Sequence, residues 1–460
     1  MKKTCLQLED LWACFQGTVP AALSTCAKDG TPNITFISQV YYVDPKHVAI
    51  SFQFFNKTHS NVRENPFACV VLLDPRTLHA YRFRLRFDHS ESTGALFESM
   101  SLQLQAVASY SGMADVFRLL AADVYEVLGV ERLEGFTRLP APPPSERSSR
   151  LFVDSGLVSL RLIAERLNKT ELLDEVLQVS LQLLDEQYGF QYSMILLMDE
   201  RNAKLLTIAS HGYQENGAGS EVGMGEGLIG MVARARRTLY LSAMDHSLRY
   251  ARAVRDRAEA IGQAEAVARE IPLPGLPDAA SQIAVPLVTR GRLVGVLAVE
   301  SKDPLAFLPR ENTLLTAIGS HLATAIDQLS RETDDVPVER PRRAPVPASR
   351  PASTRRFTFF QKDDCICVDG GYLIRNVPAR ILWRLLRQYR DDGRVEFTNR
   401  ELRMDTWLGL PEIKDNLETR LILLRRRLEQ KCPDVRLVQR GRGRFALEVD
   451  VAIDLTEKES

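Results

Sequence analysis

This sequence of 460 residues has few cysteines and no excess of positive or negative charge. The seven cysteines are scattered and form no Cys-x-x-Cys pair, which argues against a disulfide framework and against a structural zinc site. Lys and Arg together number 59, as do Asp and Glu, so affinity for nucleic acid requires a local basic patch. We therefore expect a protein of the reducing cytoplasm without a metal site.

Long hydrophobic runs are absent as well. The apolar run from Leu293 to Val299 has the length of a strand, and Glu9 and Asp10 stand where a signal peptide needs an apolar stretch. We expect neither export nor a membrane-spanning segment.

Proline is concentrated in two segments that divide the chain. Residues 139–150 are rich in proline and serine, and residues 333–355 are rich in proline and arginine, so neither segment suits a helix or a sheet. At roughly 100 to 200 residues per domain, the length suggests about three domains. The expected boundaries are 1–138 for the first domain, 151–332 for the middle domain and 356–450 for the C-terminal domain, with a tail at 451–460.

In the first domain, short runs of alternating apolar and polar residues predict an antiparallel meander. Strand-like runs span 19–26, 33–38 and 48–54, with turns between them. A polar segment at 56–66 predicts a short helix, and another strand follows. His59 and His89 have no partner at a spacing that marks a metal site or a catalytic dyad, so we expect ordinary surface histidines.

With Gly30-Thr-Pro-Asn33 and Asn61-Val-Arg-Glu-Asn-Pro66 in these places, the segment up to about residue 75 resembles the pyridoxamine-phosphate-oxidase-like FMN-binding split barrel. The resemblance implies an FMN phosphate site in the region of Lys57, Thr58, Ser60 and Asn61, with Thr58 where many members carry lysine. Hydroxyl donors, a cation and a helix N-terminus suit a phosphate dianion. The alternative is a barrel that keeps the fold without the cofactor and serves as a platform for dimerisation.

The middle domain combines helix and strand patterns. Apolar residues three or four apart predict a long amphipathic helix between Ser155 and Tyr188, and a second one spans Leu314 to Leu329. Between them lie strand signals, the loop Gly225-Glu-Gly-Leu-Ile-Gly230 and a hairpin around Gly291. In this order, these features resemble a GAF domain over almost all of residues 151–332.

The GAF resemblance implies an α/β sandwich with an antiparallel sheet, a small-molecule ligand on one face of the sheet, and dimerisation through the flanking helices. We expect the three glycines of the loop to form a turn of the fold rather than a phosphate cradle. The candidate ligand-binding residues are Ser210, His211, Gly225 and His246. The candidate interface residues of a homodimer are Leu314, Ile318 and Leu322.

The C-terminal domain begins with strand patterns at 357–368, continues with three helices and ends with a strand pair. Thr398 and Glu401 form the capping-box pattern of a helix start. This order, with Leu424-Arg-Arg-Arg-Leu428 and Arg440-Gly-Arg-Gly-Arg-Phe445, resembles the OmpR-type winged-helix DNA-binding domain. Ten basic residues against four acidic ones in 414–444 suit phosphate binding. The candidate DNA-binding residues are Thr419, Arg425, Arg426, Arg440, Arg442 and Arg444.

Helical periodicity separates two faces of the predicted helix at 416–430. Leu417, Leu421, Leu424 and Leu428 form the core face, which turns Ile422 and Leu423 outward. These two exposed aliphatic side chains contact thymine methyl groups but cannot donate hydrogen bonds to DNA. The alternative is that this face binds a protein or a second copy of the chain.

Together, these patterns predict a multidomain α+β protein: a cytoplasmic, dimeric, one-component transcription regulator. The split-barrel and GAF modules then sense a small molecule or redox state, and the winged helix binds DNA. No nucleophile–base pair or proton relay is visible, so we expect no catalytic residues. The alternatives are a split-barrel flavoprotein oxidoreductase with regulatory modules, and a signalling scaffold that works without DNA.

Overall fold

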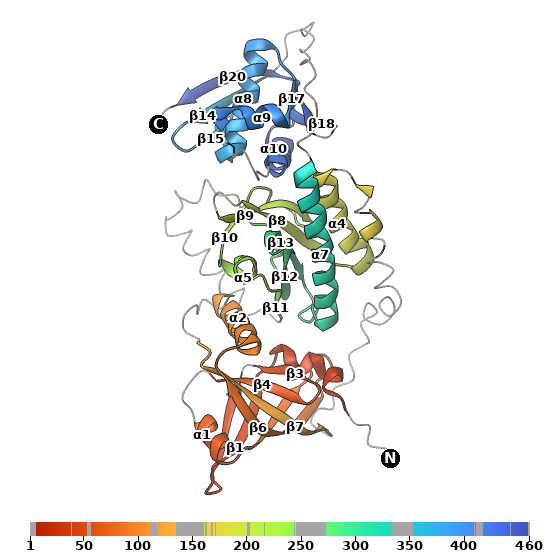
Figure 1. Ribbon diagram of the computed structural model, residues 1–460, viewed down its shortest axis with the longest axis vertical. Helices are drawn as coiled ribbons and strands as arrows, with labels where there is room; N and C mark the ends of the chain where they lie inside the picture. The colour runs from red at the N-terminus through yellow and green to blue at the C-terminus, as the bar shows by residue number, and fades with distance from the viewer. Residues whose placement is uncertain are drawn as a thin grey trace.

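Three structural units follow one another from end to end in the computed structural model (Figure 1). The structure describes residues 6–37, 39–52, 57–110, 118–134, 161, 163–166, 169–170, 172–199, 203–215, 217–242, 244, 273–332, 353–408, 410, 417–441 and 443–458. Within these ranges, no helix combines the length and the apolar character that crossing a membrane requires.

The first unit is a curled antiparallel sheet with strand order β2-β1-β5-β6-β7-β4-β3. Alternating burial along β1, with Leu23 inside, reflects the alternating sequence pattern. Phe15, Phe83 and Tyr125 lie in the core that the sheet encloses. The elements are η1 (Leu8–Gln16), β1 (Ala21–Cys26), β2 (Pro32–Ile37), β3 (Val40–Asp44), β4 (His47–Phe52), α1 (Lys57–Glu64), β5 (Phe67–Leu73), β6 (Ala80–Glu91), α2 (Ala95–Tyr110) and β7 (Ala121–Leu133).

The middle unit is a six-stranded antiparallel sheet of order β10-β9-β8-β13-β12-β11 with helices on both faces. The α4 and α7 helices bury their apolar stripes on one face, while α5 packs on the other. The elements are α4 (Leu173–Tyr188), β8 (Tyr192–Asp199), β9 (Lys204–His211), β10 (Glu221–Gly223), α5 (Gly227–Ala235), β11 (Leu239–Leu241), β12 (Ser281–Thr289), β13 (Arg292–Ser301) and α7 (Pro309–Glu332).

The burial of Leu314, Ile318 and Leu322 on α7 corrects the prediction that they form a dimer interface. Ile318 and Leu322 are buried in the core of their own unit, where α7 contacts β12, and Leu314 is partly buried beside them. The apolar stripe therefore covers the sheet of the same chain. His321, on the same helix, is exposed.

The C-terminal unit, residues 353–458, contains two sheets around three helices. One sheet has the order β16-β15-β14-β20 and the other β17-β19-β18. Its elements are β14 (Thr354–Phe360), β15 (Cys365–Val368), β16 (Gly371–Arg375), α8 (Asn376–Asp392), β17 (Glu396–Thr398), α9 (Asn399–Met404), η3 (Thr406–Leu408), α10 (Leu417–Lys431), β18 (Val435–Gly441), β19 (Arg444–Val449) and β20 (Ala452–Lys458). The capping box of Thr398 and Glu401 is present at the start of α9. Residues 451–460 were expected to form a tail beyond the domain, but β20 in this segment pairs in parallel with β14.

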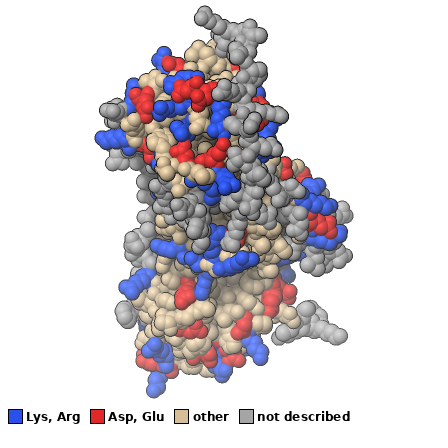
Figure 2. Space-filling model, turned by 45° about the horizontal axis from the view of Figure 1, so that its top comes forward, with Lys and Arg blue, Asp and Glu red and all other residues tan. Residues whose placement is uncertain are grey.

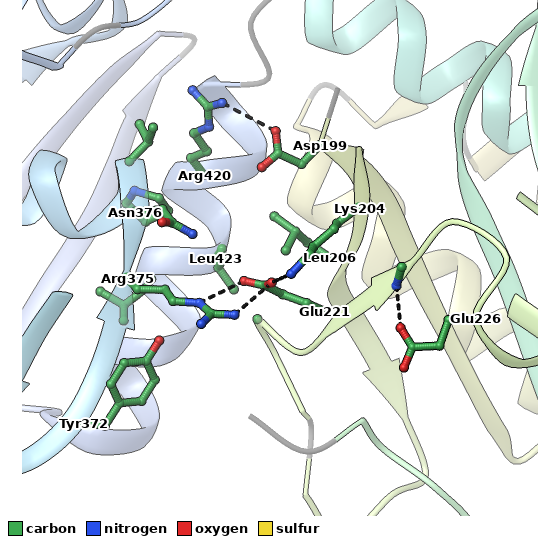
Figure 3. A pocket seen from close by; sticks show the side chains of 15 residues that line it. Asp199, Lys204, Leu206, Glu221, Glu226, Tyr372, Arg375, Asn376, Arg420 and Leu423 are labelled. Carbon is green, nitrogen blue, oxygen red and sulfur yellow. Dashed lines mark hydrogen bonds and ion pairs between the residues drawn. The ribbon is translucent and has the colours of Figure 1, made fainter. Parts of the chain in front are cut away.

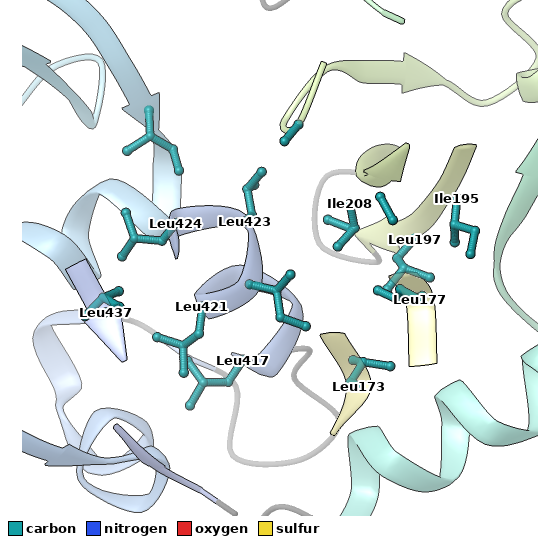
Figure 4. Close-up of a cluster of buried hydrophobic side chains, with 14 of the residues drawn as sticks. Leu173, Leu177, Ile195, Leu197, Ile208, Leu417, Leu421, Leu423, Leu424 and Leu437 are labelled. Atoms are coloured by element: carbon teal, nitrogen blue, oxygen red, sulfur yellow. The ribbon is translucent and has the colours of Figure 1, made fainter. Parts of the chain in front are cut away.

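Side chains from neighbouring units pack against each other. Helix α2 of the first unit contacts α5 and β11, and its Ala106 joins the apolar cluster around α5. Gln103 donates a hydrogen bond to the Tyr240 carbonyl at 2.6 Å. At the other end, a single apolar cluster joins the middle unit to α10 of the C-terminal unit (Figure 4).

Candidate functional site: helix α10 against the middle unit

Helix α10 has two apolar faces, and each is covered by a different part of the chain. Leu421 and Leu424 lie on the side of Leu437, within the C-terminal unit (Figure 4). Leu423 points the other way and lines a cavity together with Leu206 of β9. Residues four apart share a helix face, so one face of α10 serves its own core and the opposite face is turned toward the middle unit.

The expectation that Ile422 and Leu423 are exposed is wrong. Ile422 is 0% exposed and Leu423 4%, and the same face includes Thr419 at 4% and Arg426 at 7%. We name these four residues the docking face of α10. Periodicity predicted correctly that this face turns away from the helix's own core. However, α4 and β9 of the same chain cover it.

Arg426 is the central polar contact of the docking face. Its guanidinium donates to the carboxylate of Asp174 and to the backbone carbonyl of Ile208. In the orientation that satisfies both groups, the Gln178 amide oxygen also accepts from Arg426, at 2.7 Å and 3.1 Å. A buried guanidinium is tolerated only when its donors are satisfied, and here the middle unit supplies the acceptors.

Two more arginines of α10 reach the middle unit. Arg425 donates to Asp174 at 3.2 Å and holds the Leu437 carbonyl of its own unit at 2.9 Å. Arg420, also buried, lies 3.8 Å from Asp199 at the end of β8. Asp174 stands in the first turn of α4, where the positive end of the helix dipole favours a carboxylate. One carboxylate is therefore shared by two guanidinium groups, Arg425 and Arg426.

A crevice beside the docking face is shared by both units (Figure 3). It has a volume of about 150 Å³ and is lined by β9 and β10 on one side and by β16, the start of α8 and α10 on the other. Glu221 lies at its centre, 2.8 Å from both Lys204 and Arg375. Although burial opposes the shift, hydrogen bonds from Lys204 and Arg375 outweigh it and lower the pKa of Glu221. The Arg375–Glu221 pair thus forms a second ionic contact between the units.

Thr419, a candidate DNA contact, is buried in the interface. It lines a cavity of about 10 Å³ with Leu197 and Met198 of β8, a space of roughly one water molecule. Its hydroxyl has no hydrogen-bond partner in the part of the chain that the structure describes. Thr419 is therefore not accessible to a ligand in this arrangement.

The remaining candidate DNA contacts lie on the hairpin of β18 and β19. Arg440 is exposed and pairs with Glu448 at 2.7 Å, and Arg444 is half-buried. Arg442 lies outside the described residues. On the face shown in Figure 2, basic and acidic side chains are interspersed over the C-terminal unit. Of the ten basic residues counted in the sequence, Arg420, Arg425, Arg426, Arg436 and Arg440 lie beside carboxylates.

The four candidate FMN residues share helix α1 and differ in burial. Thr58 and Asn61 are buried, where Asn33 donates to the Thr58 hydroxyl at 2.9 Å and Asn61 donates to a neighbouring threonine hydroxyl at 3.2 Å. Lys57 and Ser60 are exposed. Two of the four residues are thus buried and hydrogen-bonded within the barrel and two are exposed, and an FMN phosphate site at these residues stays a prediction.

His59 was expected at the surface without a partner, and this expectation is wrong. Its Nδ1 lies 2.9 Å from the carboxylate of buried Asp123, which also accepts a hydrogen bond from Ser90 at 2.6 Å. The imidazole stacks on Phe52, with ring centroids 4.0 Å apart. The pairing joins residues far apart in the sequence, so no local pattern could have revealed it.

Three of the four candidate ligand-binding residues of the middle unit lie within the described residues. His211 lies 3.0 Å from Asp185 of α4, on the edge of the helix-covered face, and Ser210 precedes it on β9. His246 lies outside the described residues. Gly225 is in the loop before α5 and has φ +91°, while a Cβ on Gly230 would lie 2.2 Å from the Gly223 carbonyl oxygen. The glycines therefore form a tight turn.

Comparisons with known proteins agree with two of the three units. The family model of pyridoxamine 5'-phosphate oxidase matches residues 9–128, and the GAF domain model matches residues 170–327. No curated protein matches the chain. Among the described residues, no group of three or more His, Cys, Asp or Glu side chains is placed to hold a metal ion.

Solved structures similar to this chain each cover one unit. The GAF domain of a phosphoenolpyruvate-protein phosphotransferase from Acinetobacter is 24% identical and has a TM-score of 0.31, with 38% of this chain and 95% of that chain covered. An FMN-binding protein from Syntrophomonas wolfei is 14% identical with a TM-score of 0.23, covering 29% and 90%. HupZ from Group A Streptococcus is 20% identical with a TM-score of 0.23, covering 28% and 94%. By the two family models, the chain joins a split-barrel domain of the pyridoxamine 5'-phosphate oxidase type to a GAF domain.

Proposed function

We propose that the chain is a one-component transcription regulator whose C-terminal unit is a winged-helix DNA-binding domain of the OmpR type. The split-barrel and GAF domains then receive the signal, a small molecule or a redox state. The observation that carries the proposal is the order of elements in the C-terminal unit. A β-sheet that contains β14, β15 and β16 precedes three helices. The third helix, α10, leads directly into the hairpin of β18 and β19. In winged helices, this third helix enters the major groove and the hairpin contacts the phosphate backbone.

The basic residues of this region suit phosphate binding if DNA phosphates replace the carboxylates that pair with them. Arg420, Arg425 and Arg426 lie on α10, and Arg440 is exposed at the end of β18. Phosphate oxygens bind guanidinium groups in the same bidentate geometry as carboxylates do, so DNA offers equivalent acceptors.

Salt-dependent binding to a fluorescently labelled mixed-sequence duplex tests the proposal, with fluorescence anisotropy as the readout. We expect the affinity to fall steeply with salt, and Arg440→Ala to lower the slope of log K against log salt by about 1 because one phosphate contact is lost. The matched control is Arg82→Ala, since Arg82 is an exposed, carboxylate-paired arginine on the distant barrel. No binding at low salt, by the wild type or by variants with an undocked α10, contradicts the proposal.

A flavoprotein oxidoreductase is the alternative, and it has less support from the residues. The pyridoxamine 5'-phosphate oxidase family often binds FMN, but Thr58 and Asn61 are hydrogen-bonded inside the barrel, whereas Lys57 and Ser60 are exposed. We derive no reaction through a flavin for this chain.

The proposed homodimer is better supported at the barrel than at α7. Ile34 and Phe36 lie on edge strand β2 and are 70% and 79% exposed, and Phe67 of β5 is 57% exposed. Exposed apolar side chains on an edge strand suit pairing with a second copy. We expect Phe36→Glu to convert a dimer into a monomer in light scattering. A wild-type protein that is already monomeric at micromolar concentration contradicts the homodimer.

A further inference from the structure

The docking face of α10 is the face that the proposed function assigns to DNA. In a winged helix, the outward side of the third helix reads the major groove. Here, the outward residues Thr419, Ile422, Leu423 and Arg426 are all less than a tenth exposed, because the GAF domain covers them. DNA and the GAF domain cannot occupy this face at the same time.

We infer that the GAF domain is an intramolecular inhibitor of DNA binding, because it holds the reading face of α10 with carboxylates that replace DNA phosphates. The acidic surface consists of Asp174 and Asp199, with Glu221 beside them. This inference rests on the proposed function and adds its regulation.

Within the acidic surface, Asp174 and Asp199 each lie beside at least one arginine of α10. Asp174 binds Arg425 and Arg426, and Asp199 lies against Arg420. Both acidic residues are contributed by the GAF domain and not by the C-terminal unit, so the match exists only in the docked arrangement. Each guanidinium must leave its carboxylate before it can bind a phosphate.

The apolar part of the contact holds the docked state together without making it irreversible. Leu173 and Ile208 of the GAF domain belong to the same buried cluster as Ile422 and Leu423 (Figure 4). Ionic contacts surround this small apolar centre, and DNA can replace them with equivalent contacts. A docked and an undocked state therefore compete, and a signal acts by its different affinity for the two states.

The surface also explains how a signal reaches α10. The residues that contact the C-terminal unit lie on α4, β8, β9 and β10, which are elements of the GAF sheet and its covering helix. A ligand that shifts these elements changes the position of Asp174, the Ile208 carbonyl and Glu221 together.

A charge reversal on the GAF side tests the inference without altering the proposed DNA-binding surface. Asp174→Arg places a third cation beside Arg425 and Arg426 and therefore favours the undocked state. Glu175→Arg is the matched control because Glu175 is exposed, lies in the same first turn of α4 and gives the same change in net charge. DNA binding is measured with full-length proteins and a mixed-sequence duplex, and docking is measured by hydrogen exchange of α10 and β9.

We expect Asp174→Arg to bind the duplex at least tenfold more tightly than the wild type, with faster exchange in α10 and β9. Glu175→Arg is expected to match the wild type in both measurements. If the wild type and Asp174→Arg bind DNA equally while exchange shows undocking, inhibition is overturned and the proposed function stands. If the undocked variant does not bind DNA, the proposed function is overturned, and the inference with it. If Asp174→Arg does not fold, Asp199→Arg provides the same comparison.

Discussion

Removing the apolar centre of the docking face provides a quantitative test of the contact between α10 and the GAF domain. Ile422 is fully buried and lies one helical turn before Arg426, whose guanidinium binds the GAF domain. Ile422→Ala removes about three methylene equivalents at ~0.8 kcal/mol each, or about 2.4 kcal/mol. If the side chain is in water in the undocked state, this loss falls entirely on docking and lowers the docking constant by roughly fiftyfold.

Hydrogen exchange with peptide resolution separates docking from folding. We expect Ile422→Ala to speed exchange in peptides of α4 and β9 as well as in α10, because both sides of the contact become accessible to water. Leu424→Ala is the matched control because Leu424 is equally buried but lies on the side of the C-terminal core. It should speed exchange in α10 and β18 but leave α4 and β9 unchanged. Unchanged exchange of α4 and β9 in Ile422→Ala would refute the reasoning.

Three further predictions concern pH, the GAF core and flavin. Because the pKa of Glu221 is held below its ordinary value of 4.5, its contact with Arg375 is complete above that value and is lost as the pH falls through the lowered pKa. Exchange of β10 should therefore rise on acidification, whereas Glu221→Gln should show no such step from this contact. Ile318→Asp buries a charge and should sharply lower the thermal unfolding temperature of the GAF domain. Ser320→Asp, at an exposed position of the same helix, should not lower it. Equal effects of the two substitutions would contradict the core position of Ile318. Added FMN should keep its free fluorescence in the presence of the protein, because Thr58 and Asn61 of α1 are hydrogen-bonded within the barrel. Quenching that Lys57→Ala abolishes would contradict this expectation.

The sequence by itself determined the elements whose signals are local. The alternating pattern predicted β1, the glycine at 291 predicted the hairpin of β12 and β13, and Thr398 with Glu401 predicted the start of α9. These features depend on neighbours a few residues apart, which one chain segment contains in full. The same locality allowed the two family resemblances that the family models support.

Only the tertiary structure decided what covers each face. Periodicity shows that Thr419, Ile422 and Arg426 share a side of α10, but it does not show that α4 and β9 cover that side. The same reason explains why the stripe of α7 was assigned to a dimer and why the pairing of His59 with Asp123 was missed. A helical or strand period fixes the direction of a side chain relative to its own element, whereas burial and ionic pairing depend on segments far away in the sequence.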